Sequence, residues 1–232
     1  PRVFMAWLTP SAHAKDDAEL SMAAHILAGG KSSRLYKSLV YDKQIAQDVG
    51  ASQGSNALTS IFTIDATARP GRKPEEIEQA LQAELEQLRA KGPTEKELER
   101  ARNSIETNML SQVEKMGGRG VANLLNEYNQ YLGDPGYLAK DIERYRQVTV
   151  AGVQRAVDTY LKNQSRVVVY GVPGTPDLGA EVPTPAPGKV KPAPGTAINA
   201  DEQWRYKVPT AGPAPKIVLP QGKSLTLSNG LT

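Results

Sequence analysis

The chain has 232 residues, of which 39% are hydrophobic, so it can bury one substantial core. Its 28 Lys and Arg residues are interspersed with 25 Asp and Glu residues, and this mixed surface with a net charge of +3 excludes a nucleic-acid-binding stripe. The absence of cysteine excludes disulfides and thiolate metal sites and leaves the compartment, periplasmic or cytoplasmic, open. No apolar run approaches the roughly 20 residues that span a bilayer.

The first 70 residues predict three strands and two helices. Apolar and polar residues alternate from Phe62 to Ala68, the period-two pattern of a strand with one solvated face. Asp16 and Glu19 predict a capping box at the start of a helix, and Gly29 predicts its end. In chain order we expect a strand at 3–8, a helix between 16 and 29, a helix from Ser32 or Ser33, and strands at 49–53 and 60–68.

The next hundred residues predict mainly helices. Residues 75–91 carry acids in the first turn and bases in the last, with Gly92 as the stop, in agreement with the helix dipole. Thr94 and Glu97 predict a capping box for a helix that reaches about Lys115. We then expect a break at Gly117-Gly118-Arg119-Gly120, a helix from Val121 ended by Gly133-Asp134-Pro135, helices at 141–146 and 149–161, and a strand at 166–171 that is apolar on both faces.

This order of elements indicates an α+β fold, a mostly antiparallel sheet with helices packed on one face, and leaves the strand order open. Composition changes near Pro173, because ten of the 17 prolines lie after Gly174. We therefore predict a folded domain at 1–173, a Pro/Ala/Gly-rich linker at 174–215 and a further segment at 216–232. Trp204 and Tyr206 are expected either to anchor the linker on an apolar patch or to be exposed rings on a tether.

Familiar catalytic motifs are incomplete in this chain. Gly30-Lys31-Ser32 resembles the end of a phosphate loop, but His25 stands where that motif needs glycine, and a helix precedes it in place of a strand. The two histidines, His13 and His25, are twelve positions apart and form neither His-x-x-Glu-His nor His-Glu-x-x-His. No Gly-x-Ser-x-Gly elbow is present, and a serine triad assembled across the fold stays open. We therefore assign no catalytic residue and no metal ligand.

Several segments resemble the M16 zinc proteases (pitrilysin, insulinase, mitochondrial processing peptidase). Ser33-Arg34-Leu35-Tyr36 and Leu39 to Val49 are similar to the small-small-Ser-Arg-Leu-Tyr and Leu-Arg-x-x-x-x-Leu-Ala-Tyr-x-Val segments of the family's second subdomain. Gly92 to Arg102 is similar to its Gly-x-Thr-x-x-Glu-Leu-x-x-Ala-Lys. Weaker similarities lie at Ala28-Gly29-Gly30, Gly133-Asp134-Pro135, Val148-Thr149 and Val167-Val168-Val169. These similar segments follow one another in the family's order and together extend over residues 3–173.

The resemblance implies a fold of the LuxS/MPP-like metallohydrolase type, with the catalytic zinc in a subdomain that would precede Pro1. Family second subdomains typically hold substrate with an arginine and, seven residues later, a tyrosine. These places fall on Val40 and Gln47, which match neither residue, so no substrate-binding residue is expected. Leu225 to Leu231 resembles the first strand of a following M16 repeat.

Three functions stay open at this point. The first is a non-catalytic chamber-wall or scaffold domain of a bacterial M16-like zinc metalloendopeptidase, with the zinc outside this chain and, as partners, other M16 domains of the same polypeptide and peptide substrates. The second is a catalytically inactive homologue that serves assembly. The third is an autonomous binding module. An intact His-x-x-Glu-His upstream of Pro1 would favour the first over the second.

Overall fold

A computed structural model describes residues 1–115, 120–175, 212, 226 and 228. The chain divides into two compact units, residues 1–176 and 177–232, and the described helices and strands all lie in the first. Residues 117–119 of the predicted break, two glycines and Arg119, and the aromatic pair Trp204 and Tyr206 lie outside the described residues, as does nearly all of the predicted linker and final segment. Those expectations stay predictions.

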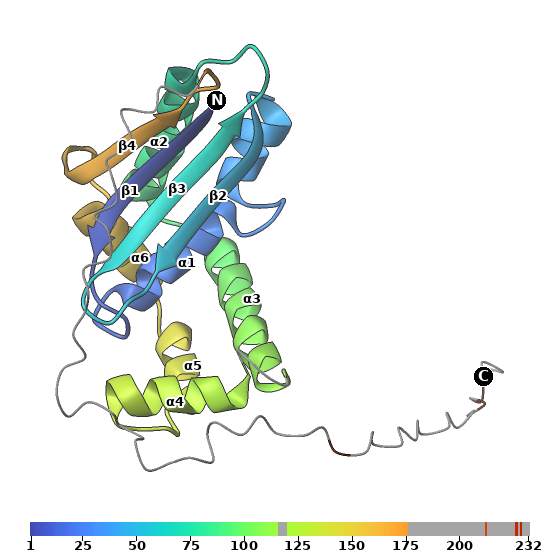
Figure 1. Ribbon diagram of the computed structural model, residues 1–232, viewed down its shortest axis with the longest axis vertical. Coiled ribbons are helices and arrows are strands. Elements are labelled where there is room, and N and C mark those ends of the chain that lie inside the picture. The colour runs from blue at the N-terminus through green and yellow to red at the C-terminus, as the bar shows by residue number, and fades with distance from the viewer. Residues whose placement is uncertain (116–119, 176–211, 213–225, 227, 229–232) are drawn as a thin grey trace. The chain divides into compact units, whose positions relative to one another are not determined.

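Four strands form one antiparallel sheet in the order β2-β3-β1-β4 (Figure 1). The strands are β1 (Arg2–Thr9), β2 (Ala46–Gly54), β3 (Ser60–Ala68) and β4 (Arg166–Gly171). The two central strands, β1 and β3, are far apart in the sequence, and their pairing brings Trp7 opposite Phe62. The antiparallel sheet expected from the sequence is confirmed.

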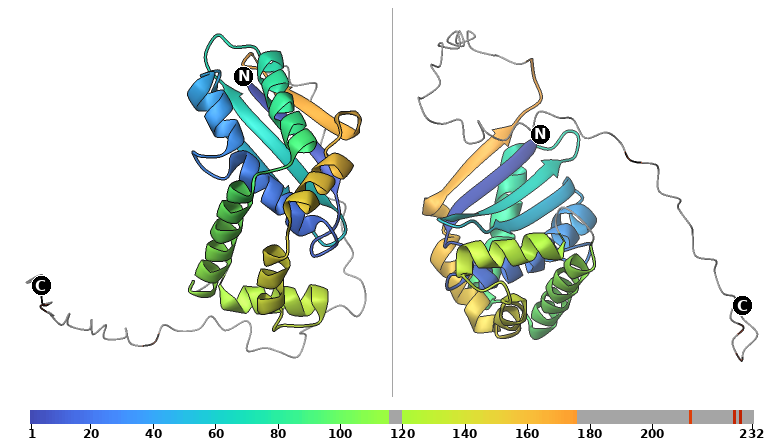
Figure 2. Two further views of the ribbon diagram at one scale, coloured as in Figure 1. Left: turned by 180° about the vertical axis from the view of Figure 1, so that it is seen from behind. Right: turned by 60° about the horizontal axis from the view of Figure 1, so that its bottom comes forward.

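Helices cover one face of this sheet and extend beyond one of its ends. Figure 1 shows α1, α2 and α6 behind the strands, and the view from behind in Figure 2 shows them in front, while α3, α4 and α5 lie past the end of the sheet. The helices are α1 (Asp17–Ala28), a π-helical segment (Tyr36–Asp42), α2 (Pro74–Lys91), α3 (Glu95–Val113), α4 (Val121–Leu132), α5 (Leu138–Arg146), α6 (Val150–Tyr160) and a short 3-10 turn (Asn163–Ser165).

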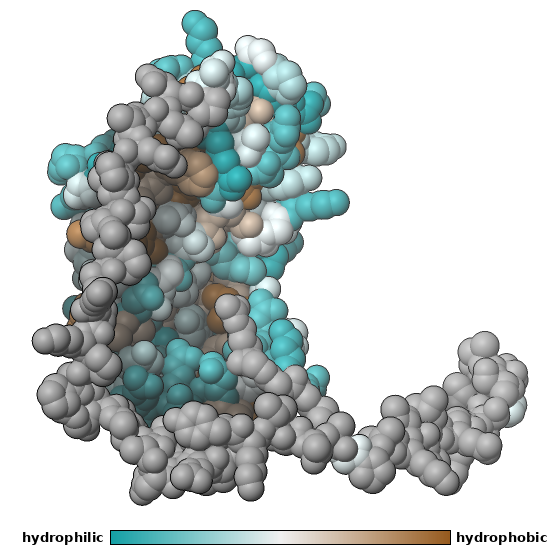
Figure 3. Space-filling model, in the orientation of Figure 1, coloured by the Kyte–Doolittle hydropathy of each residue, from teal (hydrophilic) through white to brown (hydrophobic). Residues whose placement is uncertain are grey.

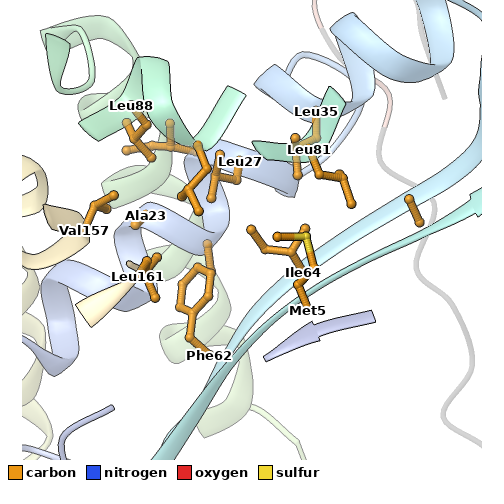
Figure 4. Close-up of a cluster of buried hydrophobic side chains, with 14 of the residues drawn as sticks. Met5, Ala23, Leu27, Leu35, Phe62, Ile64, Leu81, Leu88, Val157 and Leu161 are labelled. Carbon is orange, nitrogen blue, oxygen red and sulfur yellow. The ribbon is translucent and has the colours of Figure 1, made fainter. Parts of the chain in front are cut away.

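The core lies between the sheet and its helices. Alternate side chains of β1 and β3, among them Met5, Phe62 and Ile64, are fully buried against Leu27 of α1 and Leu81 of α2 (Figure 4). Burying each side chain of this size contributes about 1.5–3 kcal/mol. The helical spacing and strand alternation seen in the sequence thus face the same interior, and they hold the layers together.

Four local expectations need correction. Asp16 does not cap α1 through its side chain: its backbone is left-handed, with φ 72°, and its Oδ1 instead accepts a hydrogen bond from Arg155 Nη2 at 2.7 Å.

The helix expected from Ser32 or Ser33 becomes a π-helix at Tyr36–Asp42. α5 begins at Leu138, three residues before its predicted start. β4 is an edge strand with exposed valines, because it pairs with β1 alone, so its apolar run does not mark a buried strand.

The sheet face opposite the helices carries exposed apolar side chains. Register places Phe4 opposite Val169 and Leu8 opposite Ile61, and all four side chains point away from the helix layer. We call the set Phe4, Leu8, Ile61, Val167 and Val169 the open sheet face; these residues are 42–70% exposed. Figure 3 shows apolar surface over the strands. Among the described residues, no helix packs on this face (Figure 1).

Candidate functional site

The two positions that the family resemblance compares with a substrate clamp lie in different surroundings. Val40 is in the π-helical segment, 9% exposed, and packs in the core. Gln47 is exposed on the edge strand β2, at a bulge between Ala46 and Asp48. An apolar core residue cannot bind a peptide carboxylate or carbonyl, so the fold gives Val40 a packing role.

The two histidines lie at opposite ends of α1. His13 precedes the helix in a loop, and His25 is in its last turn, where burial and the Arg100 charge lower its pKa. A helix of 12 residues is about 18 Å long, so the two imidazoles cannot share one ion. Throughout 1–115 and 120–175, no group of three His, Cys, Asp or Glu side chains is arranged to hold a metal. The described residues therefore do not form a zinc site of their own.

The most concentrated polar chemistry is a cluster of His13, Asp17, Tyr128, Asp141 and Arg144, which we call the buried polar cluster. Asp17 is 1% exposed, and its Oδ2 accepts hydrogen bonds from Arg144 Nη1 at 2.8 Å and from the His13 backbone N–H at 3.0 Å. Asp141 accepts from Arg144 Nε and from the Tyr128 hydroxyl, both at 2.9 Å. The cluster ties α1, α4 and α5 together.

The charges in the buried polar cluster stabilise one another. Burial opposes ionisation of Asp141, but hydrogen bonds and charge from His13, Arg144 and Tyr128 lower its pKa. Burial and the Asp141 carboxylate raise the pKa of Tyr128, so its phenol stays protonated and donates. Arg144 stays charged between the two carboxylates. Both carboxylates are engaged by the Arg144 guanidinium and by further hydrogen bonds, so we interpret the cluster as a structural link between α1, α4 and α5.

A hollow adjoins the buried polar cluster. It lies between α4 and two loops, the one before α1 and the β2–β3 turn, and has two adjoining chambers of about 380 and 570 Å³, the larger of which is also lined by α3 and α5. We call it the α4 cleft. The residues that line both chambers are His13, Ser55, Asn123 and Glu127. Its lining is mainly polar and carries few charges.

Neither the buried polar cluster nor the α4 cleft was predicted from the sequence. Asp17 stands in the first turn of α1, where an acid is expected for the dipole alone, and Arg144 is 127 positions away along the chain. The α4 cleft also joins residues from five separate segments. One signal was available for α4: in this 12-residue helix, Glu127 is the one charged residue, which is unusual for an exposed helix.

Comparison with known proteins identifies relatives. Residues 1–105 match the family described as the Peptidase M16 inactive domain. The zinc protease PqqE of Helicobacter pylori is 25% identical over 171 residues, which are 72% of this chain and 37% of the relative. The chain thus spans just over a third of the length of the curated relative it matches. No helix of the described residues has the length and apolar character of a membrane span.

Solved structures show the same fold. The inactive peptidase domain of a candidate zinc protease from Bordetella parapertussis is 28% identical with a TM-score of 0.67, over 78% of this chain and 95% of that one. A candidate zinc protease from Bordetella pertussis Tohama I is 29% identical with a TM-score of 0.65, over 75% of this chain and 94% of that one. These likenesses and the match at 1–105 agree with the similarities noted at Arg34 and Glu97. Residues 1–105 thus resemble the Peptidase M16 inactive domain, and the fold agrees with that of the solved inactive peptidase domain from Bordetella parapertussis.

Proposed function

We propose that this domain is a non-catalytic wall and scaffold of an M16-like zinc metalloendopeptidase that hydrolyses peptides. In this proposal zinc and its ligands belong to another domain of the parent polypeptide, and this domain contributes surface. Its partners are other M16 domains of the same polypeptide and the peptide substrates of the parent. The zinc protease relatives and the inactive-domain match support the proposal.

The observation that carries the proposal is the open sheet face. One face of the sheet is covered by helices, while the other exposes Phe4, Leu8 and Val167, which are 42%, 70% and 64% exposed. Contiguous exposed apolar residues on a folded domain mark an interaction surface. A wall inside a peptidase chamber needs such a surface, because it would meet unfolded peptide segments that expose apolar side chains.

Polar groups on the same sheet face are paired with one another. Arg2 Nη2 donates to Asp65 Oδ2 at 2.6 Å, and the hydroxyls of Ser52 and Thr63 are 2.9 Å apart. The charges on this face therefore largely neutralise each other, and the apolar residues dominate what a partner meets. This suits contact with peptides of varied sequence better than recognition of one charged residue.

A second candidate is a structural, catalytically inactive M16 homologue that serves assembly. Val40 and Gln47 favour it, because neither supplies the arginine or tyrosine expected of a substrate clamp. On that hypothesis the open sheet face is an interface between domains and meets no substrate. The two candidates predict different behaviour of the parent polypeptide, and substitutions on this face can separate them.

The test uses the parent polypeptide with Leu8→Gln and Val167→Thr together, and Leu58→Gln as the matched control. Leu58 is 94% exposed, lies on the β2–β3 turn and does not belong to the open sheet face. We expect a several-fold lower kcat/KM for an apolar peptide in the double variant, with zinc content unchanged and the control like wild type. An unchanged kcat/KM would reject the wall function. A parent without chelator-sensitive peptidase activity would favour the assembly candidate.

A further inference from the structure

α4 has the composition of a binding surface. Only Glu127 is charged among its 12 residues, whereas α2 carries seven charged residues in 18. α4 also leaves Leu125 and Tyr131 43% and 55% exposed. A helix face that only meets water is normally rich in Glu, Lys and Arg. The composition of α4 therefore needs a cause other than solvation.

Three carboxamide side chains line the α4 cleft from this helix. Asn123, Asn126 and Gln130 are spaced i, i+3 and i+7, so they share one side of α4, and all three border the 380 Å³ chamber. Their side chains make no hydrogen bond to other residues that the structure describes. Asparagine also has a lower helix propensity than Glu or Lys. Two asparagines on one side of a short helix are thus locally unfavourable and leave free donors and acceptors.

The opposite side of the cleft is held in place by hydrogen bonds. The Ser55 hydroxyl donates to Asp17 Oδ1, and Asn56 Nδ2 donates to the Gly54 carbonyl at 2.9 Å. His13 is fixed by the hydrogen bond from its backbone N–H to Asp17, and its Nδ1 lies 3.8 Å from Asp141 Oδ1. The buried polar cluster thus orders one wall of the cleft before any ligand arrives, which reduces the entropy cost of binding.

We propose that the α4 cleft binds the backbone of an extended peptide, and this proposal rests on the function proposed above. Each carboxamide offers both N–H donors and a carbonyl acceptor, the same groups as a peptide unit, so a row of three can pair with successive units of an extended chain. A chamber of 380 Å³ lies within the range of ligand sites, about 300–1,000 Å³. Because Glu127 is the single charged lining residue of α4, binding depends on neutral hydrogen bonds.

The direct test is fluorescence anisotropy of the 232-residue chain with a short, unstructured, uncharged peptide of Ser, Gln and Leu, capped at both ends and labelled. The test variant carries Asn123→Ala, Asn126→Ala and Gln130→Ala. The matched control is Asn129→Ala, the same residue type on the same helix, outside the lining of the cleft. Alanine raises helix propensity at each position, so neither variant is expected to lose the fold.

We expect binding that changes little with salt and an at least tenfold higher Kd for the triple variant, from the loss of several neutral hydrogen bonds. Asn129→Ala should bind like wild type. Equal loss in both variants, no loss in the triple variant, or no binding by the wild type overturns the proposal. A concentration-dependent dimer that the triple variant abolishes, without peptide binding, would identify a second copy of the chain as the occupant and also overturn it.

The outcome is separable from that of the proposed function. If the parent cleaves peptides and the triple variant leaves its KM unchanged, the cleft proposal fails while the wall function stands. If the parent shows no peptidase activity, the wall function fails, and the anisotropy result still decides whether the cleft binds peptide.

Discussion

Arg34 and Glu97 form a bidentate ion pair between the turn after α1 and the first turn of α3. Arg34 Nε donates to Glu97 Oε1 at 2.7 Å, and Nη2 donates to Oε2 at 2.8 Å. Arg34 Nη2 also reaches the Gly92 carbonyl at 3.1 Å, while Glu97 completes the capping box with Thr94. Two segments that each resembled the M16 family in sequence are therefore bonded to each other.

Loss of Arg34 should destabilise the domain. Both side chains are 17% exposed, so Arg34→Met leaves the Glu97 carboxylate partly buried without its cation. We expect the free energy of unfolding in urea to fall by about 2 kcal/mol. The control is Arg72→Met, because the Arg72–Glu76 pair is 46% and 42% exposed and should contribute below about 0.5 kcal/mol. Equal losses in the two variants would contradict this account.

The same pair predicts acid sensitivity. The Arg34 hydrogen bond, opposed by burial and supported by Thr94, lowers the pKa of Glu97 from 4.5 to about 2. A lowered pKa in the folded state contributes stability above the unfolded pKa, and that stability is lost as pH falls through the folded pKa. Protonation of Glu97 should thus lower the free energy of unfolding by about 2 kcal/mol as the pH falls from 4.5 to 2. Urea unfolding at several pH values should show that the free energy of unfolding falls less steeply with decreasing pH in Glu97→Gln than in the wild type. An identical pH dependence in the two proteins would refute the role given to Glu97.

Replacement of Phe62 should be among the most destabilising substitutions in the core. It is fully buried and meets Trp7 edge to face, with ring centroids 6.2 Å apart. Phe62→Ala removes this contact and leaves a cavity, so we expect a loss of about 3–5 kcal/mol. Leu58→Ala, at a side chain that is 94% exposed, should change stability by less than about 0.5 kcal/mol. Thermal unfolding followed by circular dichroism measures both.

The buried polar cluster should depend on the charge of Asp17. Asp17→Asn keeps the size of the side chain but removes the anion that accepts from Arg144 at 2.8 Å. We expect a loss of about 2–4 kcal/mol, since Arg144 would be left partly uncompensated. Asp158→Asn is the control, because that side chain is 62% exposed. Faster amide hydrogen exchange in α4 and α5 of Asp17→Asn would show that the buried polar cluster holds these helices in place. Unchanged exchange there would argue against this role.

The sequence predicted those elements whose signals are local. β3 begins and ends where alternation from Ser60 to Ala68 placed it, and the Thr94–Glu97 capping box forms as expected. Asp16 failed as a cap because a tertiary contact with Arg155, 139 positions away, sets its conformation. The apolar run of β4 did not reveal an edge strand, since strand order depends on pairings that no local pattern encodes.

The candidate site was much less accessible to sequence reasoning. The resemblance directed attention to Val40 and Gln47, and the fold places Val40 in the core. The α4 cleft depends on Ser55 and Asn123 meeting across long stretches of chain, and neither residue belongs to a catalytic motif. Only the scarcity of charge in α4 was visible beforehand, and it indicates a binding surface without showing what faces it.

The central claim is that this domain supplies surface and that zinc chemistry belongs elsewhere in the parent. The most direct measurement is elemental analysis of zinc in the purified 232-residue chain after dialysis against metal-free buffer. The account predicts far less than one equivalent per chain. One equivalent retained per chain, and removed only by a chelator, would contradict it.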